Sequence, residues 1–591
     1  MRAAGKARTM RHVLDIDRSI MGQPWRWRAL AADQRDGFVP DDLVTSLLLS
    51  RGCPREGLEA HRAPSIRAFM PDPSVFRDMD TAAARIADAV EAGEKIAIFG
   101  DYDVDGATSA ALLVLLLRGL GHDAAVHIPD RMTEGYGPNA AALATLAGAG
   151  ATLIVTVDCG AQAFDVLDDA PVDVIVVDHH QCATRLPRAV AVVNPNRLDE
   201  DEGAAHGHLA AVGVCFLLGA ALLRELRGRG YFAARTEPKL LDLLDLVALG
   251  TVADVAQLRG LNRAFVAQGL KVMGGRRNVG LAALIEASRL TRAPVCSDLG
   301  FALGPRINAG GRVGRADLGV RLLTTTDVDE ARGIAAELDR LNEERRAIEA
   351  IVQEGAELAI VAERSVVVVA GAGWHPGVIG IVAGRLKEKL GRPAIVIALD
   401  DDGVGKGSGR SITGVDLGQA VLAAKEAGLL VAGGGHAMAA GLTVAAGGVA
   451  AFAAFLEERL ADAIARARED RALLVDSVLA PGGVTPDLVA ALEAGGPYGM
   501  GWPSPRVAIG PVRTIKVDVV GNGHVRAIVA GDDGRSLKAM AFRAADTPLG
   551  EALLAAGPSR RLWLAGRAKL DEWGSRPAAE LHVDDAAWVR S

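Results

Sequence analysis

The chain has 591 residues, of which 50% are hydrophobic and 4% aromatic, and its formal net charge is −8. A chain of this length exceeds what one hydrophobic core supports, so we expect several domains. The acidic balance gives no support of its own to a nucleic-acid partner, although metal ions can neutralise a cluster of acids. The sequence has no long uncharged apolar run, and its five cysteines lack CxxC spacing. These features predict a cytoplasmic protein without a membrane span or a thiolate zinc site.

The first part of the chain, residues 1–64, shows no pattern that assigns it to a fold, and we treat it as an N-terminal extension. From about residue 95 to 200, short apolar segments alternate with Ala/Leu-rich segments of helical length, and residues 210–290 are expected to be mostly helical. The expected strands lie near residues 96–100, 124–130, 152–158, 173–178 and 189–194. Nearly continuous Val/Ile runs between helices predict a doubly wound parallel sheet that is covered on both faces. Ligands bind such sheets beyond the carboxyl ends of the strands.

Three further parts follow along the chain. Residues 326–362 are nearly free of Gly and Pro and rich in Glu/Arg pairs at helical spacing, which predicts a long connecting helix. Residues 363–470 predict a second, smaller α/β domain. Residues 471–591 contain short alternating segments joined by turns such as GNG and DDG, which predict a small antiparallel β-barrel. The expected fold class is therefore a multi-domain α/β protein with a C-terminal barrel.

The segment DYDVDG places Asp101, Asp103 and Asp105 directly after the strand expected at 96–100. The spacing matches the first half of an EF-hand calcium loop, but position 12 of that loop would be Leu112 instead of the required Glu. A strand also precedes the segment where an EF-hand has a helix, so a calcium loop is excluded. Further acids and imidazoles follow the later strands and a helix: Asp158, Asp178, His179, His180 and Asp254.

Acids and imidazoles at the ends of parallel strands meet on one rim of the sheet, which predicts a metal site. Carboxylate oxygens and imidazole nitrogens suit Mn²⁺ or Mg²⁺. Asp103 and Asp105 face the same side of an extended segment, and Asp158 is placed to bridge two ions. A single acid after a strand is more often a helix N-cap, but many carboxylates on one rim would repel one another without cations. Two ions about 3.5 to 4 Å apart would activate water for attack on a phosphoryl centre.

The chain contains four motifs that resemble, in order and spacing, those of the DHH phosphoesterase superfamily: DYDVDG, VDCG, VVDHH and GTVADV. Other segments resemble the bridging segment and the DHH-associated domain of its RecJ family: GPRINAGGRVG, WHPGVIGIVAGRL, GSGRS and GGGHAMAAG. The segment PYGMGWPSP is similar to the start of that family's nucleic-acid-binding barrel. The resemblance covers residues 65–591, and it implies a DHH catalytic domain over 65–325, a DHH-associated domain over 363–470 and an OB-like nucleic-acid-binding domain over 471–591.

The resemblance also implies roles for individual residues. The expected metal ligands are Asp101, Asp103, Asp105, Asp158, His179 and Asp254. Asp178 and His180 are expected in or beside the metal shell, and His436 is expected to contact the scissile phosphate. The residues expected to bind substrate are Arg131, Arg306, Asn308, Arg312, Ser408, Arg410, Gly434, Gly435 and His436. Among these, Arg131, Ser408 and Arg410 are expected to hold the 5′ end, and Arg306, Asn308 and Arg312 to line the track of the strand. A glycine-rich loop at 433–436 is expected to approach a phosphate.

The implied function is a metal-dependent 5′-to-3′ exonuclease that degrades single-stranded DNA with two Mn²⁺ or Mg²⁺ ions and acts in DNA repair and recombination. Expected partners are single-stranded DNA with a 5′-phosphate end, a single-strand-binding protein and a helicase, and the chain is expected to be a monomer. Two alternatives stay open: a phosphodiesterase of short oligonucleotides or cyclic dinucleotides, and a non-catalytic single-stranded-DNA-binding scaffold. The barrel favours a polymer, and the complete set of acids argues against a scaffold. No residue that we can identify reads a 2′-hydroxyl, so RNA also stays open.

Overall fold

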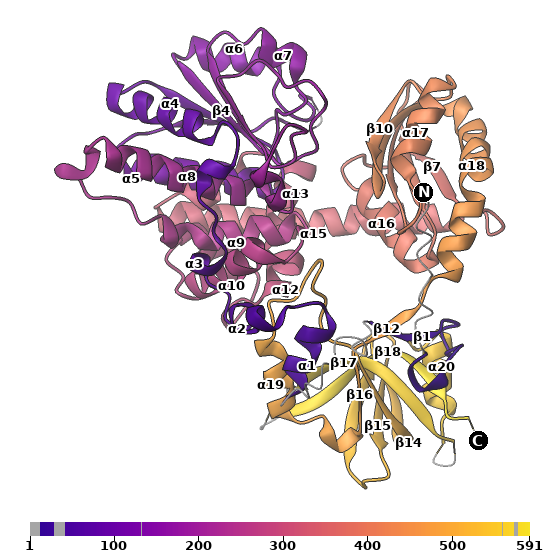
Figure 1. The fold of residues 1–591 in the computed structure, drawn as a ribbon. Helices are drawn as coiled ribbons and strands as arrows, with labels where there is room; N and C mark the ends of the chain where they lie inside the picture. The colour runs from indigo at the N-terminus through magenta and orange to yellow at the C-terminus, as the bar shows by residue number, and fades with distance from the viewer. Residues whose placement is uncertain (1–11, 29–41, 132, 558–559, 572–576, 591) are drawn as a thin grey trace, which may run out of the picture. The chain divides into compact units, whose positions relative to one another are not determined.

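The computed structural model describes residues 12–28, 42–131, 133–557, 560–571 and 577–590 (Figure 1). The chain divides into two units: one is Phe69–Asp470, and the other combines Met1–Ala68 with Arg471–Ser591. In the described part of the chain, no helix is both long enough and apolar enough to span a membrane.

The sheet that carries the predicted metal site has five parallel strands. In spatial order they are β3 (Ala125–His127), β2 (Ile96–Gly100), β4 (Leu153–Val157), β5 (Asp173–Val177) and β6 (Ala191–Val193). The three central strands are almost entirely buried, which explains their unbroken apolar sequence. The prediction of a doubly wound parallel sheet is confirmed.

Helices cover both faces of this sheet. On one face, α6 (Ala140–Gly148) and α7 (Phe164–Asp168) share a core with residues of the strands such as Phe99 and Val176. Residues on the other face pack with three helices, α4 (Met79–Ala92), α5 (Val104–Gly119) and α8 (Ala211–Gly228). Because α5 starts directly after β2 and is buried over nearly its whole length, the turn between them is fixed by packing on both sides.

A helical layer and the long helix follow the first sheet. The layer contains α9 (Leu244–Ala253), α10 (Gly260–Gly274), α11 (Val279–Ala287), α12 (Cys296–Asp298), α13 (Gly304–Val313) and α14 (Leu318–Thr324). The predicted connecting helix is α15 (Val328–Leu358), and its N-cap is Asp327. The segment GPRINAGGRVG, which composition alone would suggest to be a loop, forms α13. Its glycines allow close packing, since a Cβ at Gly311 would lie 2.8 Å from the carbonyl oxygen of Tyr102.

The second α/β domain has a mixed five-stranded sheet. In spatial order its strands are β10 (Ala432–His436), β11 (Ala439–Ala445), β9 (Val404–Arg410), β8 (Ala394–Leu399) and β7 (Val367–Ala372). One face is covered by α16 (Ile379–Leu390) and the end of α15, and the other by α17 (Leu417–Glu426) and α18 (Val449–Glu469). The expectation of a glycine-rich loop at 433–436 is wrong, because these residues pair one by one with β11 and form an edge strand.

The C-terminal region forms the predicted OB-type barrel. Its five strands are β14 (Val507–Val520), β15 (His524–Ala530), β16 (Ser536–Ala541), β18 (Ala578–Trp588) and β17 (Leu562–Asp571), and pairing of β14 with β17 closes the barrel. The helix α20 (Pro548–Ala555) lies between β16 and β17 in sequence. The inward side chains are small or branched apolar residues, such as Val525, Ala527 and Val529 along β15.

The N-terminal residues, which the sequence left unassigned, complete this second unit. Strand β1 (Trp25–Trp27) pairs in parallel with β12 (Leu473–Val475), and Figure 1 shows the indigo strand β1 next to β12. The indole of Trp25 is fully buried and donates a hydrogen bond to Asp585 Oδ2 over 3.0 Å. The helix α1 (Leu43–Ser50) is followed by Arg51, whose guanidinium lies 2.8 Å from Asp476. The described parts of the extension, residues 12–28 and 42–68, therefore belong to the same unit as the barrel.

Candidate metal centre

The acidic turn after β2 is held by its own backbone. Asp103 is the N-cap of α5, and its Oδ1 accepts hydrogen bonds from the N–H groups of Asp105 (2.8 Å) and Gly106 (3.1 Å). Gly106 is required for the tightness of the turn, since a Cβ there would lie 2.4 Å from the carbonyl oxygen of Asp101. The strand–turn–helix geometry agrees with the exclusion of a calcium loop. It brings the three carboxylates of the turn to one edge of the sheet.

Asp105 is held by the N-terminus of α8. Its two carboxylate oxygens accept hydrogen bonds from the backbone N–H groups of Ala211 (2.7 Å) and Val212 (3.0 Å). Free N–H groups at a helix N-terminus favour negative charge. Burial, together with the charges of Asp254 and Asp103, nevertheless raises the pKa of Asp105 well above its ordinary value. A further positive charge nearby would therefore stabilise the ionised form of Asp105.

Asp158 and Asp178 follow neighbouring strands, but their surroundings differ. Asp178 accepts hydrogen bonds from the backbone of Ala161 (3.0 Å), His179 (2.7 Å) and His180 (3.1 Å), and from His180 Nδ1 (2.8 Å). Burial favours its protonated form, but these donors, foremost His180, outweigh burial and lower its pKa to about 2. Asp158 is equally buried, and its pKa is raised well above the ordinary value by burial and by neighbouring carboxylates, Asp105 first.

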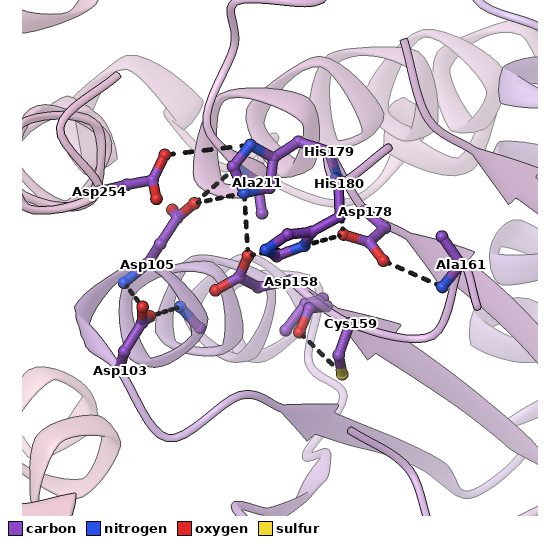
Figure 2. Close-up of polar contacts among 12 residues, drawn as sticks. Asp103, Asp105, Asp158, Cys159, Ala161, Asp178, His179, His180, Ala211 and Asp254 are labelled. Carbon is purple, nitrogen blue, oxygen red and sulfur yellow. Dashed lines mark hydrogen bonds and ion pairs between the residues drawn. The ribbon is translucent and has the colours of Figure 1, made fainter. Parts of the chain in front are cut away.

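His179 presents one nitrogen to the carboxylates. Its Nδ1 lies 3.1 Å from the carbonyl oxygen of Leu209, and because a carbonyl can only accept, Nδ1 carries the proton. Nε2 then has a lone pair and lies 3.3 Å from Asp158 Oδ1 and 3.9 Å from Asp105 Oδ2 (Figure 2). Burial, and next the charge of His180, lower the pKa of His179 to about 4. A neutral imidazole with a free Nε2 is the form that binds metals.

His180 has the opposite protonation. Burial alone would lower its pKa, but the hydrogen bond and the charge of Asp178 raise it to about 9. Its Nδ1 donates to Asp178 Oδ1. At neutral pH, without a metal, His180 therefore carries a positive charge beside the acidic cluster.

Asp101 and Asp254 flank the cluster from two further directions. Burial, and next the charge of Asp103, raise the pKa of Asp101 to about 8 and that of Asp254 to about 7. Asp254 follows the C-terminus of α9, and its Oδ2 lies 3.9 Å from His179 Nδ1 (Figure 2). Near neutral pH, without a metal, Asp101 would be mostly protonated and Asp254 about half protonated, because burial and then the neighbouring negative charge oppose ionisation.

The predicted ligands converge on a site that fits divalent ions. Their donor atoms form three groups in which all atoms lie within 4.8 Å of one another: Asp158, His179 and His180; Asp105, His179 and Asp254; Asp101, Asp103 and Asp158. Among the described residues, three donor atoms of this cluster are buried and make no hydrogen bond: Asp101 Oδ1, Asp158 Oδ1 and His179 Nε2. Unpaired buried donors and carboxylates with raised pKa are what bound cations would satisfy. Oxygen ligands with one or two imidazoles suit Mn²⁺ or Mg²⁺.

Three of the predicted substrate-binding arginines, Arg131, Arg312 and Arg410, interact electrostatically. Burial, and then the charges of Arg131, Arg345 and Arg410, lower the pKa of Arg312 to about 10, and its Nη1 donates to the carbonyl of Gly377 over 2.8 Å. Arg410 donates to Ser408 Oγ over 3.1 Å, and burial followed by the charge of Arg131 lowers its pKa.

The start of α16 lies against this arginine group. A Cβ at Gly380 would lie 2.9 Å from Ser408 Oγ and 3.0 Å from Arg410 Nη2. Guanidinium groups, a hydroxyl and helical N–H groups are the donors of an anion site.

The other predicted residues lie outside these groups. Arg306 is buried and pairs with Asp339 over 2.8 Å, so it ties α13 to α15 and its guanidinium is engaged inside the fold. Asn308 is half-buried on α13. Gly434 and Gly435 lie in the edge strand β10, and His436 ends that strand with an exposed side chain.

Sequence reasoning missed the residues that hold the two histidines. Asn196 Nδ2 donates to the carbonyl oxygens of His179 (2.6 Å) and Gly207 (3.0 Å). Asn194 Nδ2 donates to the carbonyl oxygen of His180 over 2.9 Å. The segment NPN directly after β6 was the available signal, since short polar side chains at a strand end bind nearby backbone.

Comparison with known proteins places three family models on the chain. The DHH family, N-terminal domain, matches residues 95–251; the DHHA1 domain matches 363–462; and the RecJ OB domain matches 475–585. A single-stranded-DNA-specific exonuclease RecJ of Dickeya dadantii is 39% identical over 511 residues, which are 83% of this chain and 88% of that protein. The protein of the same name from Escherichia coli is 36% identical over 92% of this chain and 95% of its own length.

Solved structures agree with these matches. The crystal structure of RecJ from Thermus thermophilus in complex with Mn²⁺ has a TM-score of 0.75 and 29% identity, and the match covers 96% of this chain and 80% of that chain. A crystal structure of exonuclease RecJ bound to manganese has a TM-score of 0.56 and 35% identity over 67% of this chain and 98% of that chain.

Proposed function

Because the chain belongs to the RecJ family of the DHH superfamily, we propose that it is a metal-dependent exonuclease that hydrolyses the phosphodiester bonds of single-stranded DNA. The observation that carries this proposal is the convergence of carboxylate and imidazole donors on one rim, with buried donor atoms that have no hydrogen bond among the described residues. A buried cluster of this kind is unfavourable for the metal-free chain, so its presence in the fold points to a bound cation.

The metal ligands of the proposal are Asp101, Asp103, Asp105, Asp158, His179 and Asp254. When bound, two divalent ions, Mn²⁺ or Mg²⁺, supply the chemistry of water activation and charge neutralisation at phosphorus. Asp105 and His179 are fixed by backbone groups of α8 and of Leu209. This fixation holds their free lone pairs toward the cluster before any ion arrives.

Asp178, His180 and His436 have supporting roles in the proposal. Asp178 has its lone pairs filled by hydrogen bonds, so it orients His180 and the backbone after β5. The charged imidazole of His180 is placed to attract a phosphate and to stabilise the charge that develops on it. His436 is exposed at the end of β10, and Gly434 and Gly435 leave the backbone beside it uncovered by side chains, which supports contact with a phosphate of the strand.

Polarity is proposed to come from the arginine group. Arg131, Arg312, Ser408 and Arg410 form an anion site at the start of α16, and it suits a 5′-phosphate. A terminal phosphate held near the metal ligands would direct cleavage from the 5′ end. Asn308 is proposed to line the path of the strand on α13, with Arg306 supporting that helix through Asp339.

The barrel is proposed to bind further nucleotides of the strand, which favours a polymer over the short oligonucleotides or cyclic dinucleotides of the alternative. OB barrels bind oligonucleotides on the outer face of their second and third strands, here β15 and β16. Directly after β16, Phe542 is 52% exposed and packs edge-on against His524 and His582. Trp502 is buried against Arg51 and His61, so it serves packing.

The wider setting belongs to the same proposal. We propose that the chain acts in the cytoplasm as a monomer, in DNA repair and recombination, on single strands with a 5′-phosphate end. A helicase would supply such strands, and a single-strand-binding protein would cover them. The non-catalytic scaffold is disfavoured because every motif acid is present and converges on the rim.

The test is product formation from a single-stranded DNA oligonucleotide that is labelled at its 3′ end, with Mn²⁺ and with chelator. The chain is compared with Asp158→Asn and with Asp245→Asn, a control that changes a buried acid outside the cluster. We expect a ladder that shortens from the 5′ end and is lost in chelator and in Asp158→Asn only. An intact long strand with cleavage of dinucleotides would favour the small-substrate alternative, and binding without cleavage would favour the scaffold.

A further inference from the structure

Two of the four tyrosines of the chain, Tyr102 and Tyr136, meet beside the metal cluster. The ring of Tyr136 lies 6.4 Å from that of Tyr102 and 5.9 Å from that of His180, edge-on in both cases. The hydroxyl of Tyr136 donates a hydrogen bond to the backbone carbonyl of Asp158 over 3.1 Å. The ring is therefore held in a defined place next to two residues of the site.

In spite of these contacts, Tyr136 is 54% exposed. The residues on either side, Gly135 and Gly137, have φ of 85° and 78°, a region that other residues rarely adopt. A Cβ at Gly135 would meet nothing within 4 Å, so the space next to this neighbour of Tyr136 is open. A tyrosine with a packing role would be buried, whereas this turn projects its ring outward at the rim of the site.

The partner ring connects Tyr136 to the proposed phosphate site. The guanidinium of Arg131 lies over the face of Tyr102 at 4.7 Å from the ring centroid. Arg131 also acts electrostatically on Arg312 and Arg410. An open aromatic ring and a cation for phosphate thus both adjoin Tyr102, and a nucleotide offers a flat base and a phosphate within one residue.

We propose that the exposed ring of Tyr136 is a stacking platform for one base of the single strand at the metal centre, with Tyr102 and Arg131 positioned against the neighbouring phosphate. This inference rests on the proposed function and adds a binding site to it. Stacking requires only a π face, so one ring accepts every base. An enzyme that moves along a strand of any sequence needs that tolerance.

The experiment pairs a side-chain change with a substrate change. The substrates are 5′-phosphorylated single-stranded oligonucleotides in which an abasic site replaces the first, second or third nucleotide, and the intact strand. Loss of one stacked base weakens binding roughly 5- to 150-fold. We expect the wild-type chain to bind and degrade one of the abasic strands about tenfold or more less efficiently than the intact strand.

The Tyr136→Leu variant should bind and degrade the intact strand and that abasic strand equally well. The Tyr136→Phe variant should retain the difference between the two strands that the wild-type chain shows. Phe542→Leu is the matched control, since Phe542 has a similar exposure of 52% in the barrel. This variant can bind all substrates more weakly, but it should keep the difference between intact and abasic strands. Binding measured in chelator separates recognition from turnover.

A base analogue makes the test independent of the folding of the leucine variant. 2-Aminopurine placed at each of the three positions should lose fluorescence on binding to the wild-type chain and to Tyr136→Phe at the same position that shows the abasic effect. The platform is overturned if no position shows quenching, or if Tyr136→Leu keeps the full abasic effect. Base-dependent binding without degradation would leave the platform standing and overturn the nuclease, and absence of any strand binding would overturn both.

Discussion

Asp254→Asn should stabilise the metal-free chain at alkaline pH and reduce the stabilisation that Mn²⁺ gives. Burial and the charge of Asp103 raise the pKa of Asp254 from 3.8 to about 7. A carboxyl group whose folded-state pKa is raised contributes stability that is present below its unfolded pKa and is lost as the pH rises through the folded pKa. Above pH 7 the ionised side chain therefore opposes folding, and a neutral amide does not.

The magnitude follows from the shift. A difference of about 3 pKa units corresponds to at most about 4 kcal/mol when the pH lies well above 7. Protons that neighbouring carboxyl groups retain relieve part of the repulsion, so we expect about 2 kcal/mol from the substitution. The amide also removes an anionic ligand, so Mn²⁺ should bind the variant more weakly and stabilise it less than the wild-type chain.

The assay is thermal unfolding in chelator at about pH 4 and about pH 8.5, and with excess Mn²⁺ at the higher pH. The transition to follow is the one that Mn²⁺ shifts in the wild-type chain, since a chain with several domains does not unfold in one step. The variant should melt about 2 to 6 °C above wild type at the higher pH in chelator and equal it near pH 4. Equal destabilisation at both pH values, or an undiminished response to Mn²⁺, would refute the reasoning.

Other positions test other parts of the structure. Gly106→Ala should lower Mn²⁺ affinity about tenfold or more in calorimetry, because its Cβ would lie 2.4 Å from the carbonyl oxygen of Asp101; an unchanged affinity would contradict the need for glycine. Asp245→Asn should raise the midpoint temperature of thermal unfolding when measured above pH 6 and leave it unchanged below about pH 4, because burial raises the pKa of Asp245 to about 6; a pH-independent effect would count against this cause. Trp25→Ala should destabilise the barrel by about 3 to 5 kcal/mol in denaturant titration, since the indole is buried and bonded to Asp585; a neutral result would mean that the N-terminal residues are dispensable.

Much of the catalytic rim could be predicted because parallel strands place their carboxyl ends at one edge. Asp103, Asp158 and His179 are far apart in sequence, yet strand order alone brings their backbones together. What strand order cannot predict is which carboxylates are free. Asp178 accepts an N–H from Ala161, whereas Asp158 Oδ1 makes no hydrogen bond among the described residues. That difference depends on loop backbone that no periodicity reveals.

Glycine-rich segments limit what composition can predict for a related reason. Composition suggests loops at GPRINAGGRVG and GGGH, but the first is the helix α13 and the second the edge strand β10. In both segments glycine serves close packing: Gly311 approaches the backbone of Tyr102, and a Cβ at Gly435 would lie 2.4 Å from the carbonyl oxygen of Ala439. Close approach is a tertiary property, so local composition cannot distinguish it from a flexible turn.

The two adjacent histidines show how far chemistry can diverge within one motif. His179 donates to the carbonyl of Leu209 and has a pKa lowered to about 4, whereas His180 donates to Asp178 and has a pKa raised to about 9. One is therefore a neutral ligand and the other a cation at neutral pH in the metal-free chain. A double alanine variant would remove both properties at once, so only single substitutions can separate loss of metal binding from loss of charge beside the phosphate.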